Sequence, residues 1–284
     1  MTEINVLNHD QNSEISETLS NEGDIFNIST RLQKLMLQIK GDFMTGEGKS
    51  VDYHGIRSSQ VFIRYIAECS RLVTVDLASL SQSERIAFFI NIYNSLTIHG
   101  ICEQGLPSSV LGVKDFWKTI AYNIGGHVFS LDDIEHGILR GNRPHPSSPN
   151  PLFDESDPRL QYIVVDFDPR IHFALVCGAK SCPAINVYST KNLERGLQAA
   201  TDNFCSQEIH VDIHSKKVTL SKIFQWYKRD FAEKDIDLLI WIQRNSSGKV
   251  SADLKQLVTE NHDDVTLVYS NYNWELNTVK LTNM

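Results

Sequence analysis

The sequence predicts an α+β fold in which a small mixed β-sheet packs with several helices. Three observations indicate this class. Several segments carry apolar residues at helical spacing, short apolar runs typical of strands lie between them, and Gly125-Gly126 marks a two-residue hairpin turn. Strands scattered among helices in this way favour a mixed sheet, in an α/β or α+β arrangement.

Length and composition are typical of a soluble globular protein. The 284 residues, of which 41% are hydrophobic and 22% charged, suit one large domain or a domain with a tail. The net charge of −8 and the lack of a long basic run favour neither a nucleic acid partner nor an anionic membrane surface. No apolar run approaches a membrane span, and the N-terminus lacks a secretory signal pattern. Five cysteines, an odd and sparse set, predict a cytoplasmic protein with reduced thiols.

The first part of the chain predicts a tail and two helices. Residues 1–24 are polar, and we expect them to be disordered and dispensable for folding. Residues 29–43 carry one apolar stripe and predict a packed helix. A glycine-containing connector leads to a second helix over about 60–71.

A buried helix is predicted over about 84–103, because its surface is apolar almost all round. Ser81 or Ser83 can cap it. One side carries a polar stripe, formed by Asn91, Asn94, Ser95 and His99. Buried amides need partners, so this stripe is expected to pin neighbouring loops. The alternative is that Asn91 or Asn94 donates to an oxyanion in a pocket.

The middle of the chain predicts a hairpin over 119–130, followed by a helix over 131–139 that Ser130 caps. This helix contains Glu135 and His136. A long proline-rich loop over 141–158, of a kind that is often functional, and a strand or extended segment over 160–167 follow. Beyond residue 190 the patterns predict helices at about 192–205, 222–231, 235–245 and 251–260, a hairpin at 208–220 and a strand at 265–269.

The central stretch of the chain is 168–183. Its apolar run 170–176, interrupted by His172, predicts a strand that ends at Cys177, where Gly178 can turn the backbone. A thiol at the end of a strand can act as a nucleophile when a base lies beside it. The alternative is a buried cysteine that acts as a small hydrophobic residue.

Candidate partners for Cys177 can be sorted by geometry. On a strand, His172 would point to the opposite face, whereas His136 comes from another element. Glu135 can orient His136 only if the helix frays, because adjacent helical side chains diverge by about 100°. Asp132 shares a helix face with His136 and is the alternative orienter. Cys182 is the alternative nucleophile. A metal site formed by Cys177 and Cys182 is weakly supported, because the sequence has no second closely spaced pair of cysteines.

The chain resembles the domain of unknown function 547 family in five stretches that occur in the family's order: 87–94, 130–140, 168–183, 220–231 and 272–277. The resemblance implies a family domain over about 55–277, and no established reaction. The family is also distantly similar to papain-like and transglutaminase-like thiol enzymes, which implies that outline for the fold. The chain then divides into a tail (1–24), a helix and connector (25–54), the domain (55–277) and a C-terminal tail (278–284).

Two functions follow as hypotheses. The first is a thiol hydrolase or acyltransferase with Cys177 as nucleophile, His136 as base, Glu135 as its orienter and Asn91 at the oxyanion site. The second is a non-catalytic module that holds a protein partner in the same cleft or on the proline-rich loop. No cofactor is expected, and nothing in the sequence identifies the substrate.

Overall fold

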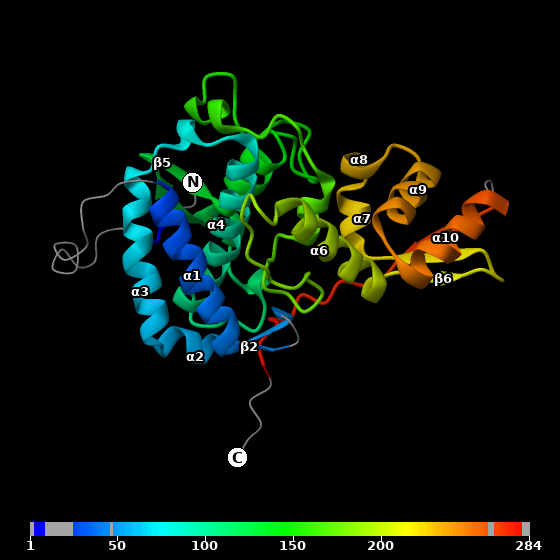
Figure 1. Cartoon of the computed structure of the whole chain (residues 1–284), viewed down its shortest axis with the longest axis horizontal. Coiled ribbons are helices and arrows are strands. Elements are labelled where there is room, and N and C mark those ends of the chain that lie inside the picture. The colour runs from blue at the N-terminus through cyan, green and yellow to red at the C-terminus, as the bar shows by residue number, and fades with distance from the viewer. Residues whose placement is uncertain (1–2, 9–24, 46–47, 261–263, 280–284) are drawn as a thin grey trace, which may run out of the picture. The chain divides into compact units, whose positions relative to one another are not determined.

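The structure is a computed structural model that describes residues 3–8, 25–45, 48–260 and 264–279 (Figure 1). The chain divides into two compact units. Unit 1 comprises Met1–Phe167, Leu175–Leu193 and Trp274–Met284, and unit 2 comprises Asp168–Ala174 and Glu194–Asn273. The expected domain over 55–277 therefore includes parts of both units.

Unit 1 combines helices with two small sheets. Its α-helices are α1 (Ile25–Phe43), α2 (Tyr53–Ser58), α3 (Gln60–Cys69), α4 (Gln82–Glu103) and α5 (Phe116–Thr119). Short 3₁₀ helices are η3 (Ser70–Thr74), η4 (Leu77–Ser79), η5 (Val110–Gly112) and η7 (Pro158–Tyr162), and η6 (Asp133–Leu139) is a π-helix. The strands are β1 (Asn5–Val6), β2 (Met44–Thr45), β3 (Ser50–Val51), β4 (Ile120–Ile124) and β5 (His127–Ser130).

Helix α4 lies in the core of unit 1, as its apolar surface predicts. Ser81 caps it in a capping box, in which Glu84 accepts from the Ser81 backbone N–H. Phe89 and Tyr93 are only 0% and 2% exposed. The predicted burial of this helix is confirmed.

The three-stranded sheet of unit 1 has the order β1-β4-β5, with a parallel and an antiparallel pair, and β2 and β3 form a separate two-stranded sheet. Strands β4 and β5 form the predicted hairpin, and Gly125 and Gly126 turn it with positive φ angles of 59° and 82°. Strand β1 corrects the expectation of a disordered tail over 1–24. Its residues pair with β4, and the Asn8 side chain accepts from Asn123 N and donates to Cys69 O and Asn123 O. Residues 1–2 and 9–24 of the expected tail lie outside the described residues.

Two segments contain a 3₁₀ helix and no strand. Residues 160–167, predicted as a strand or an extended segment, begin in η7, and residues 170–176, predicted as a strand, begin in η8 (Pro169–Phe173). Each 3₁₀ helix begins with Asp-Pro-Arg. The carboxylates of Asp157 and Asp168 accept from the backbone N–H of the arginine two residues on, and proline occupies the first helical turn. This local capping signal overrides the apolar run that predicted strands.

Unit 2 contains η8, α6 (Leu193–Glu208) apart from its first residue, and a sheet of β6 (His210–Asp212), β7 (Lys217–Leu220) and β8 (Thr266–Tyr269). The β6–β7 pair is antiparallel, as predicted, and β7–β8 is parallel. The predicted helix 222–231 is divided at Tyr227 into α7 (Lys222–Trp226) and α8 (Lys228–Phe231). Helices α9 (Asp235–Asn245) and α10 (Gly248–Glu260) follow.

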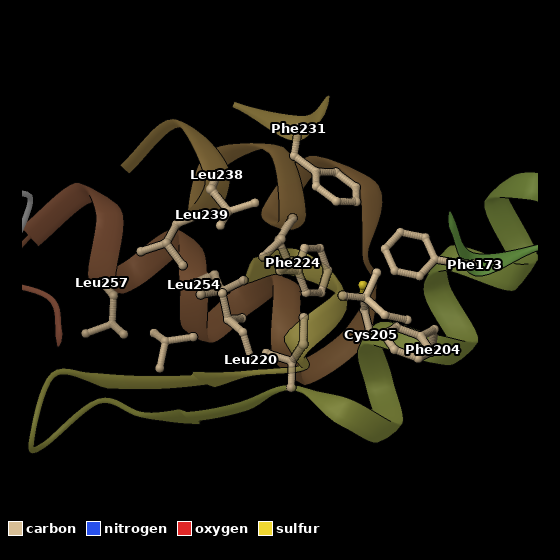
Figure 2. Packing of buried hydrophobic residues seen from close by; sticks show 14 of the residues in the cluster. Phe173, Phe204, Cys205, Leu220, Phe224, Phe231, Leu238, Leu239, Leu254 and Leu257 are labelled. Carbon is tan, nitrogen blue, oxygen red and sulfur yellow. The ribbon is translucent and has the colours of Figure 1, made fainter. Parts of the chain in front are cut away.

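The core of unit 2 is a continuous hydrophobic cluster between its helices and sheet (Figure 2). Aromatic rings gather at one end of the cluster, where the Phe173 and Phe204 centroids lie 4.9 Å apart and Phe173 and Phe224 lie 5.4 Å apart. Leucines from α9 and α10 fill the other end. The α+β class with mixed sheets is thus confirmed, with several small sheets in place of one. No helix in the described ranges is long and apolar enough to cross a membrane.

Candidate functional site

The two central cysteines lie at either end of one tight loop in unit 1. Gly178 begins the loop with a φ of 84°, and Cys182 N donates to Ala179 O at 3.0 Å. The Sγ atoms of Cys177 and Cys182 are 2.6 Å apart, and the Cys177 N–H lies 3.1 Å from Cys182 Sγ. Cys177 is half-buried and Cys182 is buried. The two candidate nucleophiles therefore form one paired site.

Backbone contacts from distant segments hold this thiol loop in place. Val176 N, directly before Cys177, donates to Asn94 Oδ1 at 2.9 Å. Asn277 N donates to Gly178 O at 2.9 Å, and its side-chain Oδ1 accepts from Tyr53 OH at 2.8 Å. A side-chain carbon added at Gly178 would lie 2.6 Å from the end of the Ile101 side chain, and the positive φ of Gly178 itself favours glycine. The loop is pre-organised from both sides.

The predicted helix that carries Glu135 and His136 is the π-helix η6. Ser130 and Asp133 cap it reciprocally, because Asp133 Oδ2 accepts from Ser130 N and Ser130 Oγ accepts from Asp133 N. Its C-terminal bonds span five residues, as in Arg140 N to Glu135 O at 2.9 Å. Such π-helices are rare and occur frequently at functional sites.

The imidazole of His136 is held by residues four positions away on either side. Arg140 Nη1 lies 2.8 Å from His136 Nδ1 and 2.9 Å from Pro144 O. Because an arginine only donates, Nδ1 accepts, and the neutral ring carries its proton on Nε2. Nε2 lies 3.9 Å from Asp132 Oδ1. Asp132, the alternative orienter, therefore lies beside the ring on its Nε2 side.

Glu135 and Asp132 are both largely buried but have different surroundings. Tyr93 OH donates to Glu135 Oε2 at 2.9 Å. Burial, together with the nearby charge of Glu135, raises the pKa of Asp132 from 3.8 to about 7. Asp132 can therefore exchange a proton with its surroundings near neutral pH.

Helix α4 connects these two parts of the site. Tyr93 of this helix contacts Glu135 of η6. The next residue, Asn94, contacts Val176, which directly precedes the thiol loop. Asn91, one turn earlier, holds a third segment: its Nδ2 donates to Tyr188 O at 2.7 Å and its Oδ1 accepts from Tyr188 N at 2.9 Å. The polar stripe of α4 thus pins neighbouring loops, as expected from buried amides. Asn91 uses both ends of its amide on a backbone segment rather than presenting it to the thiol.

A pocket of about 600 Å³ borders this site on the Asp132 side. Its wall includes the apolar side chains of Ile4, Val128 and Leu152. Lys118 and Asp132 also line it. The carboxyl that faces His136 is therefore also part of a pocket wall.

The remaining candidate histidine and cysteines are buried and packed against other side chains of the fold. His172 belongs to unit 2, where its Nε2 lies 2.8 Å from Asp230 Oδ2 and its ring stacks on Tyr227. Cys69, Cys102 and Cys205 are buried, and burial raises the pKa of each thiol to about 12. Among the described residues, no group of three or more His, Cys, Asp or Glu side chains could hold a metal ion.

Sequence reasoning did not find Tyr93 and Asn277 as parts of the site. Tyr93 belongs to the helix predicted over 84–103, whose surface is apolar almost all round, and its hydroxyl gave no signal of a distant carboxylate partner. Asn277 ends the stretch 272–277 that resembles the family, which was the one available signal. Both act through partners far away in the chain, so only the folded structure identifies them.

Comparisons with known proteins support one resemblance. Residues 77–205 match the family described as "Protein of unknown function, DUF547". This range contains α4, η6 and the thiol loop, while the stretches 220–231 and 272–277 lie beyond it. No curated protein and no solved structure gave a match. The predicted resemblance to the domain of unknown function 547 family is thereby confirmed over residues 77–205.

Proposed function

We propose that the protein is a thiol hydrolase or acyltransferase in which Cys177 is the nucleophile and His136 the base. One observation carries the proposal. Tyr93 and Asn94, adjacent on α4, fasten the η6 turn that bears His136 and the loop that begins with Cys177. Both candidate reacting groups are thus anchored to the same turn of one buried helix, which is the rigid support that a nucleophile and its base require.

The proposed reaction is acyl transfer through a thioester. His136 accepts the Cys177 proton at Nδ1, because Nε2 already carries one, so Arg140 Nη1 first turns away from this nitrogen and keeps its bond to Pro144 O. The thiolate attacks the acyl carbonyl, and the protonated imidazole returns its proton to the leaving group. Water or a second acceptor then releases the acyl group from sulfur.

The carboxylates have separate parts in this proposal. Asp132 faces His136 Nε2 and stabilises the imidazolium that forms, while Glu135, bonded to Tyr93, positions the η6 turn. Asn91, expected at the oxyanion site, is assigned the role of holding the Tyr188 segment. The five free cysteines accord with a reducing compartment, so we expect a cytoplasmic location.

Iodoacetamide labelling across pH, read for each cysteine by peptide mass spectrometry, tests the proposal. Cys177 should label faster than Cys69, Cys102 and Cys205, whose thiols are buried. The substitution His136→Ala should shift the Cys177 profile toward the value of a free thiol, about 8.5. The control His214→Ala, in an exposed turn of unit 2, should not shift it.

A second measurement addresses the reaction itself. Incubation with p-nitrophenyl acetate should place an acetyl group on Cys177, with release of p-nitrophenol that slows in His136→Ala. If Cys177 labels no faster than Cys69 and takes no acetyl group, the catalytic proposal is wrong. The binding-module hypothesis then remains.

A further inference from the structure

The two sulfur atoms of the thiol loop lie close enough together to form a disulfide bond, a reaction that acyl transfer does not require. Cys177 Sγ and Cys182 Sγ lie 2.6 Å apart as free thiols, close to the usual disulfide bond length of about 2.05 Å. We propose that Cys177 and Cys182 are a reversible redox pair, which a small disulfide oxidises to an intramolecular disulfide and small thiols reduce.

The loop is built so that this bond forms with little rearrangement. Gly178 and the hydrogen bond from Cys182 N to Ala179 O already bring its two ends together. Lys180 N donates to Glu275 O at 2.9 Å, and Ala179 pairs with Leu276 as an antiparallel bridge. Because these contacts order the loop in the reduced state, closing the bond costs little further chain entropy.

The two cysteines are suited to successive steps. The half-buried Cys177 is the one that a small disulfide reaches, whereas Cys182 is 2% exposed. The Cys177 thiolate attacks the small disulfide, so that one S–S bond breaks, a mixed disulfide forms and a small thiolate leaves. Cys182, whose sulfur the Cys177 N–H contacts at 3.1 Å, then attacks Cys177 Sγ and expels the second small thiolate. In sum, two protein thiols are oxidised and one small disulfide is reduced to two thiols.

The other cysteines do not offer this arrangement. The Cys69 thiol contacts Tyr122 OH at 3.6 Å and the Cys102 thiol contacts Tyr53 O at 3.9 Å. Both are fully buried, as is Cys205. Oxidation by a small disulfide is therefore expected at the Cys177–Cys182 pair.

The bond would regulate the proposed enzyme. If Cys177 is the nucleophile, as proposed above, the disulfide removes its thiolate and stops acyl transfer until the bond is reduced. This regulatory role rests on the proposed function, whereas formation of the disulfide does not.

The test uses the full chain in buffers of reduced and oxidised glutathione at increasing oxidised fraction, followed by alkylation and peptide mass spectrometry. We expect a linked Cys177–Cys182 peptide, loss of alkylation at both residues, and full recovery with excess reduced glutathione. In Cys182→Ser the reaction should stop at a glutathione adduct on Cys177. The control Cys205→Ser should still form the linked peptide.

Two outcomes would overturn the inference. One is a stable glutathione adduct on Cys177 of the unsubstituted chain without the linked peptide. The other is a linked peptide that forms only in denaturant. The acetyl transfer assay is carried out separately on the fully reduced protein. A negative result there does not affect the disulfide measurement, and a negative disulfide result does not affect the assay.

Discussion

The ring of Phe153 lies directly against the α-carbon of Gly137, so that a side-chain carbon at this glycine would overlap with the ring. Phe153 comes from the proline-rich loop and Gly137 from the middle of η6. The loop is held there by Asn142, whose side chain bonds both the N–H and the C=O of Phe153, each at 2.9 Å. This contact packs the loop onto the helix that carries His136.

Gly137→Ala should therefore destabilise unit 1. The added methyl group displaces a buried ring, and overpacking of this kind costs about 1–3 kcal/mol. Urea unfolding measures the change. Gly112→Ala is the matched control, since nothing lies within 4 Å of its added carbon, and it should leave the unfolding free energy almost unchanged. Equal effects of the two substitutions would contradict the packing described here.

The Tyr93–Glu135 hydrogen bond predicts a measurable coupling between α4 and η6. Tyr93→Phe removes the hydroxyl that donates to the buried Glu135 carboxylate and should lower the free energy of unfolding by about 1–3 kcal/mol. In a double-mutant cycle with Glu135→Gln, we expect a coupling energy of about 0.5–3 kcal/mol from urea unfolding. Additive effects would mean that the contact does not join the two helices.

Asp132 predicts a pH dependence of stability. Its folded pKa of about 7 lies above its usual 3.8, so between these values the unfolded chain loses the proton first. Stability therefore falls as pH rises from about 4 to about 7. Asp132→Asn removes this pH dependence. The free energy of unfolding of the variant minus that of the unsubstituted chain should therefore increase by up to about 4 kcal/mol as pH rises across that window.

A carboxylate with the opposite shift serves as the control for this pH measurement. Hydrogen bonds from Ser156 lower the pKa of the exposed Asp154. Asp154→Asn should therefore lose, rather than gain, relative stability as pH rises from acid toward neutral. A pH-independent difference between Asp132→Asn and the unsubstituted chain would show that the Asp132 carboxyl is not buried as described.

Asn8 predicts that the start of the chain stabilises the fold. Asn8→Ala removes its hydrogen bonds to Cys69 O and to the backbone N–H and C=O of Asn123, of which the bond to Cys69 O is buried, and this costs about 1–3 kcal/mol. Thermal unfolding should show a drop of several degrees. Ile4→Ala, at a side chain that is 52% exposed, should change the midpoint little. An unchanged midpoint for Asn8→Ala would restore the expectation that this segment is dispensable.

Elements with strong local signals were predictable from the sequence. The helix 82–103 has a capping box and an apolar surface on all sides, and the hairpin at Gly125-Gly126 has the two residues that adopt positive φ most readily. The strand predicted over 170–176 was wrong because Asp168-Pro169 starts a 3₁₀ helix there. That signal is also local, and the apolar run outweighed it in the prediction.

The sequence by itself determined the identity of the candidate groups, the α+β class and the family resemblance. Only the tertiary structure decided which groups meet. Asp132 lies 3.9 Å from His136 Nε2, Tyr93 donates to Glu135, and the Cys177 and Cys182 sulfurs lie together. The physical reason is that these contacts depend on how α4, η6 and the thiol loop pack. Residue type and spacing along one element specify which face a side chain occupies, whereas its partner on that face comes from a segment distant in the chain.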